Sequence, residues 1–160
     1  MFSGNFKVSI DDRYLEDYEV GSVHSFGPLV VQEEDILTFA GQFDPQPIHV
    51  NHTAAEKSIF GGIIASGWHT ASLMMRLFVD YYLTHAASLS SPGVDELRWQ
   101  KPVRPGDALT LRVTVSQVTP SRSKPDRGML HSFIEMLNQR GEVVMTMKAM
   151  NLIGRRKMPV

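Results

Sequence analysis

The period of the apolar residues changes abruptly near residue 93, and this change constrains the fold more than any other feature. From about Gly67 to Ala87, apolar residues occupy almost every face of a helical projection, which is typical of a buried helix. A helix of that length spans roughly 30 Å. After residues 90–93 the period becomes two, and we expect strands at 94–101, 109–116, 128–138 and 143–152.

The N-terminal half predicts one further strand and two smaller helices. Residues 18–31 alternate loosely and are punctuated by glycine and proline, which favours a short strand. An acidic first turn at 32–35 opens a helix. We expect residues 41–52 to form a loop in which Pro45 and Pro47 exclude a helix, and a short helix to cover 53–58.

One strand, a helical middle and four sequential strands can pair as an antiparallel meander. Only the 67–87 helix is long and apolar enough to cover that sheet. The predicted fold class is therefore α+β: a hot-dog fold, in which an antiparallel β-sheet wraps around one long buried helix. We expect residues 1–17 to be an N-terminal lead-in, 18–153 to be the domain and 154–160 to be a C-terminal tail.

Composition excludes several classes of protein. The 160 residues include no cysteine, which rules out disulfides, thiolate metal sites and cysteine nucleophiles. With a formal net charge of −1, the protein has no overall electrostatic attraction to nucleic acid or to an anionic membrane. With no signal peptide and no spanning segment, we expect a cytoplasmic protein. An open sheet has unpaired edges, so a homodimer or a dimer-based higher oligomer is expected.

Asp44 and His49 are the pair of residues best suited to chemistry. A carboxylate and an imidazole can divide acid and base roles, because their usual pKa values lie on opposite sides of neutrality. Prolines stiffen the loop between them, so both side chains can face one cleft. The alternative is structural, with Asp44 capping the loop and His49 capping the next helix. Taken alone, this spacing favours the structural interpretation.

The residues around this pair resemble the hydratase motif of the MaoC-like family. The resemblance runs from Phe39 through Asp44 and His49 to Ala55, where the family has approximately an aromatic residue, small residues, Asp-x-Asn-Pro-aliphatic-His and a later Ala or Ser. It continues in the segments 60–67 and 102–109. Together these cover most of residues 18–152; the first motif is fairly specific, and the Pro-Gly-Asp turn alone is weak.

This resemblance implies a hydro-lyase that adds water to an enoyl-CoA thioester or removes it from a 3-hydroxyacyl-CoA. Asp44 and His49 would be catalytic, and the backbone N–H of Gly67 would meet the thioester oxygen. A helix N-terminus suits that role, although a packing glycine is an equal alternative. The implied substrate-binding residues are Phe43, Gln46, Ser66 and Trp68. Coenzyme A would be needed only as part of the substrate, and no other cofactor is implied.

Three of these positions depart from the family pattern. Gln46 stands where the family has Asn, Phe43 stands where Gly is common, and Ser66 replaces a frequent His. Gln46 keeps the hydrogen-bonding capacity of the amide, whereas Phe43 could reshape the pocket. The three departures therefore affect the expected identity of the substrate more than the expected type of reaction.

Other candidates are weaker. No metal site is expected, because His52 and His69 lack a metal-binding spacing and are expected to cap helices or lie at the surface. The run Arg122–Arg127 could contact coenzyme A phosphates, or it could be a solvated hairpin loop. A thioesterase of this architecture would typically carry its catalytic carboxylate on or just before the central helix. This function is disfavoured because no Asp or Glu lies between Lys57 and Arg76. A non-catalytic acyl-CoA-binding module would not need Asp44 and His49 together.

Overall fold

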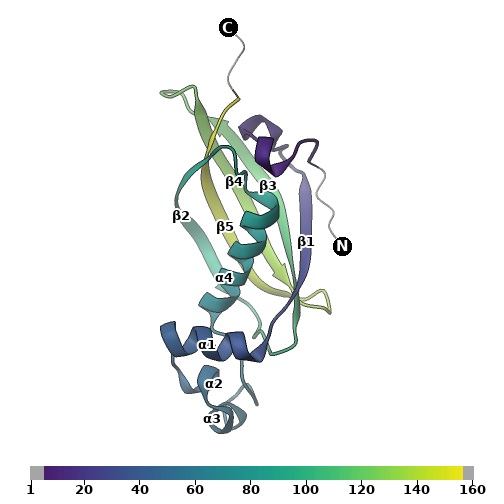
Figure 1. Cartoon of the computed structure of the whole chain (residues 1–160), viewed down its shortest axis with the longest axis vertical. Helices are drawn as coiled ribbons and strands as arrows, with labels where there is room; N and C mark the ends of the chain where they lie inside the picture. The colour runs from purple at the N-terminus through teal and green to yellow at the C-terminus, as the bar shows by residue number, and fades with distance from the viewer. Residues whose placement is uncertain (1–5, 157–160) are drawn as a thin grey trace.

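In the computed structural model, which describes residues 6–156, an antiparallel sheet curves around one helix (Figure 1). The helical elements are α1 (Glu33–Phe43), α2 (Pro47–Val50), α3 (His52–Glu56) and α4 (Gly67–Leu77). The strands are β1 (Val23–Val30), β2 (Ser88–Trp99), β3 (Ala108–Pro120), β4 (Arg127–Leu137) and β5 (Val143–Gly154). The helix α4 lies across one face of the sheet, while α1, α2 and α3 gather at one end of it (Figure 1). This arrangement confirms the predicted hot-dog architecture.

The order of the strands differs from the predicted meander. The sheet runs β1-β3-β4-β5-β2, with every neighbouring pair antiparallel. Only β3, β4 and β5 follow one another as expected, because β2 pairs with β5 and forms an edge. Periodicity identifies a strand but not its neighbour, which explains the error. β2 also begins before the predicted strand at 94–101, since it starts at Ser88 and passes through residues 90–93 with irregular register.

The central helix is shorter than the sequence indicates. It ends at Leu77 and continues as a π-helical turn, η3 (Phe78–Tyr82). The side chain of Arg13, only 4% exposed, donates hydrogen bonds to the carbonyl oxygens of Tyr81 and Tyr82 at this end. The segment before β1 supplies this cation, together with the 3₁₀ turns η1 (Ile10–Asp12) and η2 (Leu15–Asp17). The division at residue 17 stays a prediction, and residues 1–5 and 157–160 of the expected lead-in and tail lie outside the described residues.

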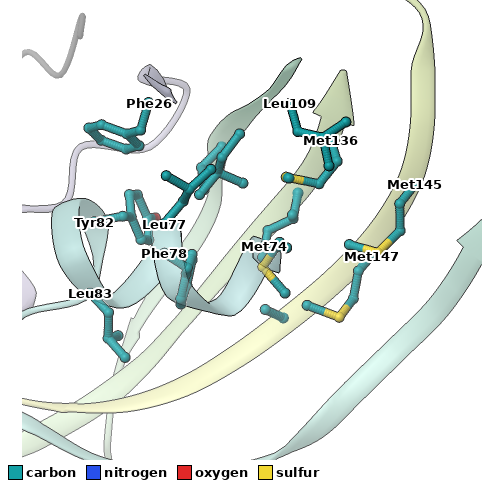
Figure 2. Close-up of a cluster of buried hydrophobic side chains, with 14 of the residues drawn as sticks. Phe26, Met74, Leu77, Phe78, Tyr82, Leu83, Leu109, Met136, Met145 and Met147 are labelled. Atoms are coloured by element: carbon teal, nitrogen blue, oxygen red, sulfur yellow. The ribbon is translucent and has the colours of Figure 1, made fainter. Parts of the chain in front are cut away.

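One side of α4 is exposed, contrary to the expectation of a helix buried all round. Trp68, Met75 and Val79 lie on that side, at the spacing of a single helical stripe. The opposite side packs on the sheet through Met74, Leu77 and Phe78. Figure 2 shows Met74 facing Met145 and Met147 of β5 in this core. No helix in residues 6–156 is long and apolar enough to cross a membrane.

The segment 41–52 is largely helical, so the predicted loop is wrong. The helix α1 extends to Phe43, and α2 begins directly at Pro47. Proline is favoured at the first position of a helix, where its missing N–H costs nothing. Gln46, which precedes it, is extended as expected of a residue before proline. Pro47 therefore starts a helix in the segment where the two prolines were expected to exclude one.

Candidate active site

Asp44 and His49 meet beyond one end of the sheet, beside the N-terminus of α4. Asp44 ends α1 and His49 lies in α2. Their side chains face one another, with His49 Nε2 3.4 Å from Asp44 Oδ2. The structural alternative for His49, a helix cap, does not describe this geometry.

A backbone carbonyl fixes the orientation of the His49 ring. His49 is 5% exposed, and its Nδ1 lies 2.7 Å from the carbonyl oxygen of Ile64. A carbonyl oxygen can only accept, so Nδ1 carries a proton and donates it. In the neutral imidazole the lone pair is then on Nε2, the atom that faces Asp44. The ring is therefore oriented so that Nε2, the nitrogen that faces the Asp44 carboxylate, can accept a proton.

Two hydrogen bonds hold the carboxylate of Asp44. Ser66 Oγ donates to Oδ2 and Gln46 Nε2 donates to Oδ1, both at 2.7 Å. These bonds, with the Ser66 hydroxyl foremost, and the nearby His49 lower the pKa of Asp44 below its usual value. Asp44 is consequently ionised at neutral pH. Gln46 and Ser66, two of the expected substrate-binding residues, thus act on the carboxylate in this structure.

The N-terminus of α4 lies beside this pair. Ser66 is its N-cap, and its Oγ accepts a hydrogen bond from Trp68 N. Among the described residues, none accepts a hydrogen bond from the backbone N–H of Gly67. A Cβ at Gly67 would lie 2.4 Å from Cε2 of Trp99, far inside van der Waals contact. Any larger residue at position 67 would therefore displace the indole of Trp99, which packs against the Cα of Gly67.

A cavity of about 250 Å³ lies next to the pair. His49 and Gly67 both line it, together with Trp99, and the other lining residues are Phe60, Ile64, Ala65, Thr70, Gln100, Lys101, Pro102 and Val103. Phe43 and Trp68 are not among its lining residues, and they are 69% and 58% exposed. Their assignment to substrate binding stays a prediction. The sequence carries no signal for Trp99, because a tryptophan at the end of a strand has no distinctive spacing.

The remaining candidate residues lie away from Asp44 and His49 or are buried in the packed interior. His52 is exposed and pairs with Glu33, whereas His69 is buried, which corrects the expectation that it caps a helix or lies at the surface. The ring of His69 stacks on Phe39, and burial lowers its pKa. Within residues 6–156 no group of three or more metal-binding side chains occurs. The basic loop 122–127 joins β3 to β4 at the other end of the sheet from α1–α3 (Figure 1).

The chain is similar to proteins of one family. The MaoC like domain matches residues 19–129. An (R)-specific enoyl-CoA hydratase from Rhodospirillum rubrum is 32% identical over 123 residues, which are 72% of this chain and 80% of that protein. The protein YdeM of Bacillus subtilis is 32% identical over 79% of this chain and 88% of its own length.

A solved structure agrees with this assignment. The crystal structure of a MaoC-like dehydratase from Rhodospirillum rubrum has a TM-score of 0.84 and 43% identity, and the match covers 91% of this chain and 99% of that chain. The family match spans the site, the central helix and most of the sheet. The chain therefore belongs to the MaoC-like family of hydratases and dehydratases.

Proposed function

We propose that this protein catalyses the reversible addition of water to the double bond of an enoyl-CoA thioester, with Asp44 and His49 as the acid–base pair. The observation that carries the proposal is that two hydrogen-bond acceptors, His49 Nε2 and Asp44 Oδ2, face one another at 3.4 Å. A water molecule that lies beside both atoms, within hydrogen-bond distance of each, can donate one proton to each acceptor. That water is then held and activated by the same pair.

The proposed reaction balances without a redox or metal cofactor. His49 Nε2 takes a proton from the water, whose oxygen bonds to C3 of the substrate. The C2–C3 π electrons shift toward the thioester oxygen, giving an enolate. The imidazolium, stabilised by ionised Asp44, returns the proton to C2 and the thioester carbonyl forms again. General acid–base help of this kind is worth about 10²–10⁴ in rate.

The N-terminus of α4 supplies the partial positive charge that stabilises the negatively charged enolate oxygen. Gly67 is its first residue, and its N–H is free among the described residues. The positive end of the helix dipole adds to this donor. One such donor typically contributes about 10²–10³ in rate. We propose that Phe43 and Trp68, which are exposed near the pair, contact the coenzyme A part of the substrate. We also propose that the reaction takes place in the cytoplasm.

A hydration assay tests the proposal. Purified protein should hydrate crotonyl-CoA or a longer enoyl-CoA, followed by loss of the conjugated thioester absorbance. We expect Asp44→Asn and His49→Gln each to lower kcat by at least about 10²-fold, with unchanged circular dichroism. The matched control is His52→Gln, since His52 is exposed and paired only with Glu33. Full activity in either site variant, or no hydration of any enoyl-CoA by the native protein, contradicts the proposal.

We also propose a homodimer formed through β2 and the exposed residues Met75 and Val79, which lie beyond the first turn of α4. The edge strand β2 carries the exposed residues Leu89 and Val94, and the central helix carries the exposed Met75 in α4 and Val79 in η3. An unpaired edge with apolar neighbours fits a second copy of the same strand around a two-fold axis.

Sedimentation velocity tests the dimer. A charge placed in the proposed interface, Met75→Asp, should shift the protein toward the monomer, because burying an unpaired carboxylate costs several kcal/mol by order of magnitude. Val30→Asp is the control, since Val30 is 50% exposed on the opposite edge strand β1. A native monomer, or equal effects of the two variants, contradicts this assembly.

A further inference from the structure

The indole of Trp99 lies against the first residue of α4. Three atoms of its ring, Cε2, Cδ2 and Nε1, lie 2.4, 2.5 and 2.8 Å from the ideal Cβ position of Gly67. The nitrogen is thus among the ring atoms closest to the helix terminus. Trp99 ends β2 and lines the same cavity as Gly67 and His49. Its polar atom is consequently placed where the thioester is expected.

One oxygen can accept hydrogen bonds from both groups. A backbone nitrogen lies about 2.5 Å from its own Cβ position. Since Trp99 Nε1 lies 2.8 Å from that position on Gly67, the two nitrogens are at most about 5 Å apart. Two donors at that separation can share one acceptor at about 2.9 Å from each. The geometry therefore admits a carbonyl oxygen held by two N–H groups.

The indole N–H is available, and its ring, which is 45% exposed, packs against Gly67 and Trp68. Among the described residues, none accepts a hydrogen bond from Trp99 Nε1. The ring of Trp68 packs edge-on against it, with the centroids 5.1 Å apart and the planes at 77°. An indole nitrogen can only donate. Its single proton thus suits an oxygen that gains negative charge.

We propose that Trp99 is a further catalytic residue, whose indole N–H donates to the thioester oxygen beside the N–H of Gly67. This inference rests on the proposed hydration of an enoyl thioester. As water adds to C3, the π electrons move onto the thioester oxygen, and both donors stabilise that charge. No proton leaves Trp99, and the charge returns to the carbonyl when C2 is protonated.

Two replacements separate the N–H from the shape of the ring. Trp99→Phe removes the donor and keeps an aromatic ring over Gly67. Site-specific replacement of Trp99 by benzothienylalanine keeps the full bicyclic shape and exchanges only the N–H for sulfur, which protects the test against misfolding. We expect kcat with an enoyl-CoA to fall about 10²-fold in both. The dissociation constant for a saturated acyl-CoA should change by less than about threefold, because the neutral carbonyl gains little from this bond.

A second measurement needs no turnover. Hydrogen bonds polarise a carbonyl and lower its stretching frequency, so infrared difference spectra with a ¹³C-labelled saturated acyl-CoA report on the donors directly. We expect a shift to lower frequency in the native protein and a smaller shift in the benzothienylalanine protein. Full kcat or an undiminished shift in that protein overturns the role of Trp99, as does a loss confined to binding. If Asp44→Asn leaves hydration intact while the shift depends on Trp99, the acid–base assignment fails and the donor stands.

Discussion

Ser66 Oγ donates a hydrogen bond of 2.7 Å to Asp44 Oδ2 and also accepts one from Trp68 N. The same hydroxyl thus orients the carboxylate at the end of α1 and caps the first turn of α4. Ser66 itself is fully buried, at 0% exposed. The position of the carboxylate is thereby coupled to the helix terminus that faces the cavity.

Replacing this hydroxyl should affect activity, stability and pH dependence together. In Ser66→Ala we expect lower kcat and a loss of about 0.5–2 kcal/mol in the free energy of unfolding, as for other N-caps. The bond from Ser66 lowers the pKa of Asp44, so its removal raises that pKa. The acid limb of the rate profile should then move to higher pH. Ser72→Ala, exposed on the same helix, is the control; an unmoved acid limb would refute the coupling.

His69 should make the protein less stable in acid. Burial lowers its pKa from the usual value of 6.5. Above pH 6.5 the group is neutral in the folded and unfolded chains and contributes nothing to the pH dependence. As the pH falls below 6.5, the unfolded chain takes up the proton first, so the free energy of unfolding decreases.

Urea unfolding at several pH values measures this effect. His69→Leu should lose less stability than the native protein between neutral pH and about pH 5. The exposed His52 provides the control variant, His52→Gln, for which the native pH dependence should persist. Identical curves for the native protein and His69→Leu would assign the acid sensitivity elsewhere.

Two glycines on helices should respond to alanine in opposite directions. A Cβ at Gly41 in α1 meets nothing within 4 Å, so Gly41→Ala should stabilise the protein by about 0.5–1 kcal/mol. A Cβ at Gly67 meets the ring of Trp99, so Gly67→Ala must displace the indole and should lower kcat. Thermal unfolding and the hydration assay measure the pair. A Gly67→Ala enzyme with native kcat would show that neither the glycine nor the indole position matters.

Arg13 should stabilise the protein without contributing to catalysis. Its guanidinium holds the carbonyl oxygens of Tyr81 and Tyr82 at the opposite end of the central helix from Gly67. In Arg13→Met both carbonyl oxygens lose this donor, while Tyr82 O keeps the hydroxyl of Tyr18, so the change should cost about 1–3 kcal/mol. Arg76→Met, which breaks only an exposed pair with Asp80, should cost less than about 0.5 kcal/mol. A fall in kcat of Arg13→Met at a temperature where it stays folded would contradict a purely structural role.

The sequence predicted elements better than it predicted their arrangement. Alternation identified the strands now seen as β3, β4 and β5, because each has one buried face. The place of β2 at the edge could not follow from periodicity, since most of its residues are exposed on both faces. Similarly, the end of α4 depends on Arg13, a residue 68 positions from its partner Tyr81, and such a distant contact leaves no local signal.

The candidate site was predictable only in its local part. Asp44 and His49 are five residues apart within one motif, so the sequence could suggest that they meet, although the loop expected between them is partly the helix α2. The carbonyl of Ile64, which fixes the His49 ring, and the indole of Trp99 come from other segments. Backbone acceptors and packed rings carry no distinguishing residue pattern. Their positions follow from the fold as a whole.

The central helix is secured at both ends by different parts of the chain, and its middle packs on methionines. Ser66 and Asp44 secure the first turn, Arg13 secures the last, and Met74 faces Met145 and Met147 between them (Figure 2). Unbranched thioether side chains repack at little cost. During evolution, substitutions at these methionines can therefore reshape the interior beneath the helix while the reactive groups keep their positions. Selectivity can diverge in this lineage without loss of the underlying chemistry.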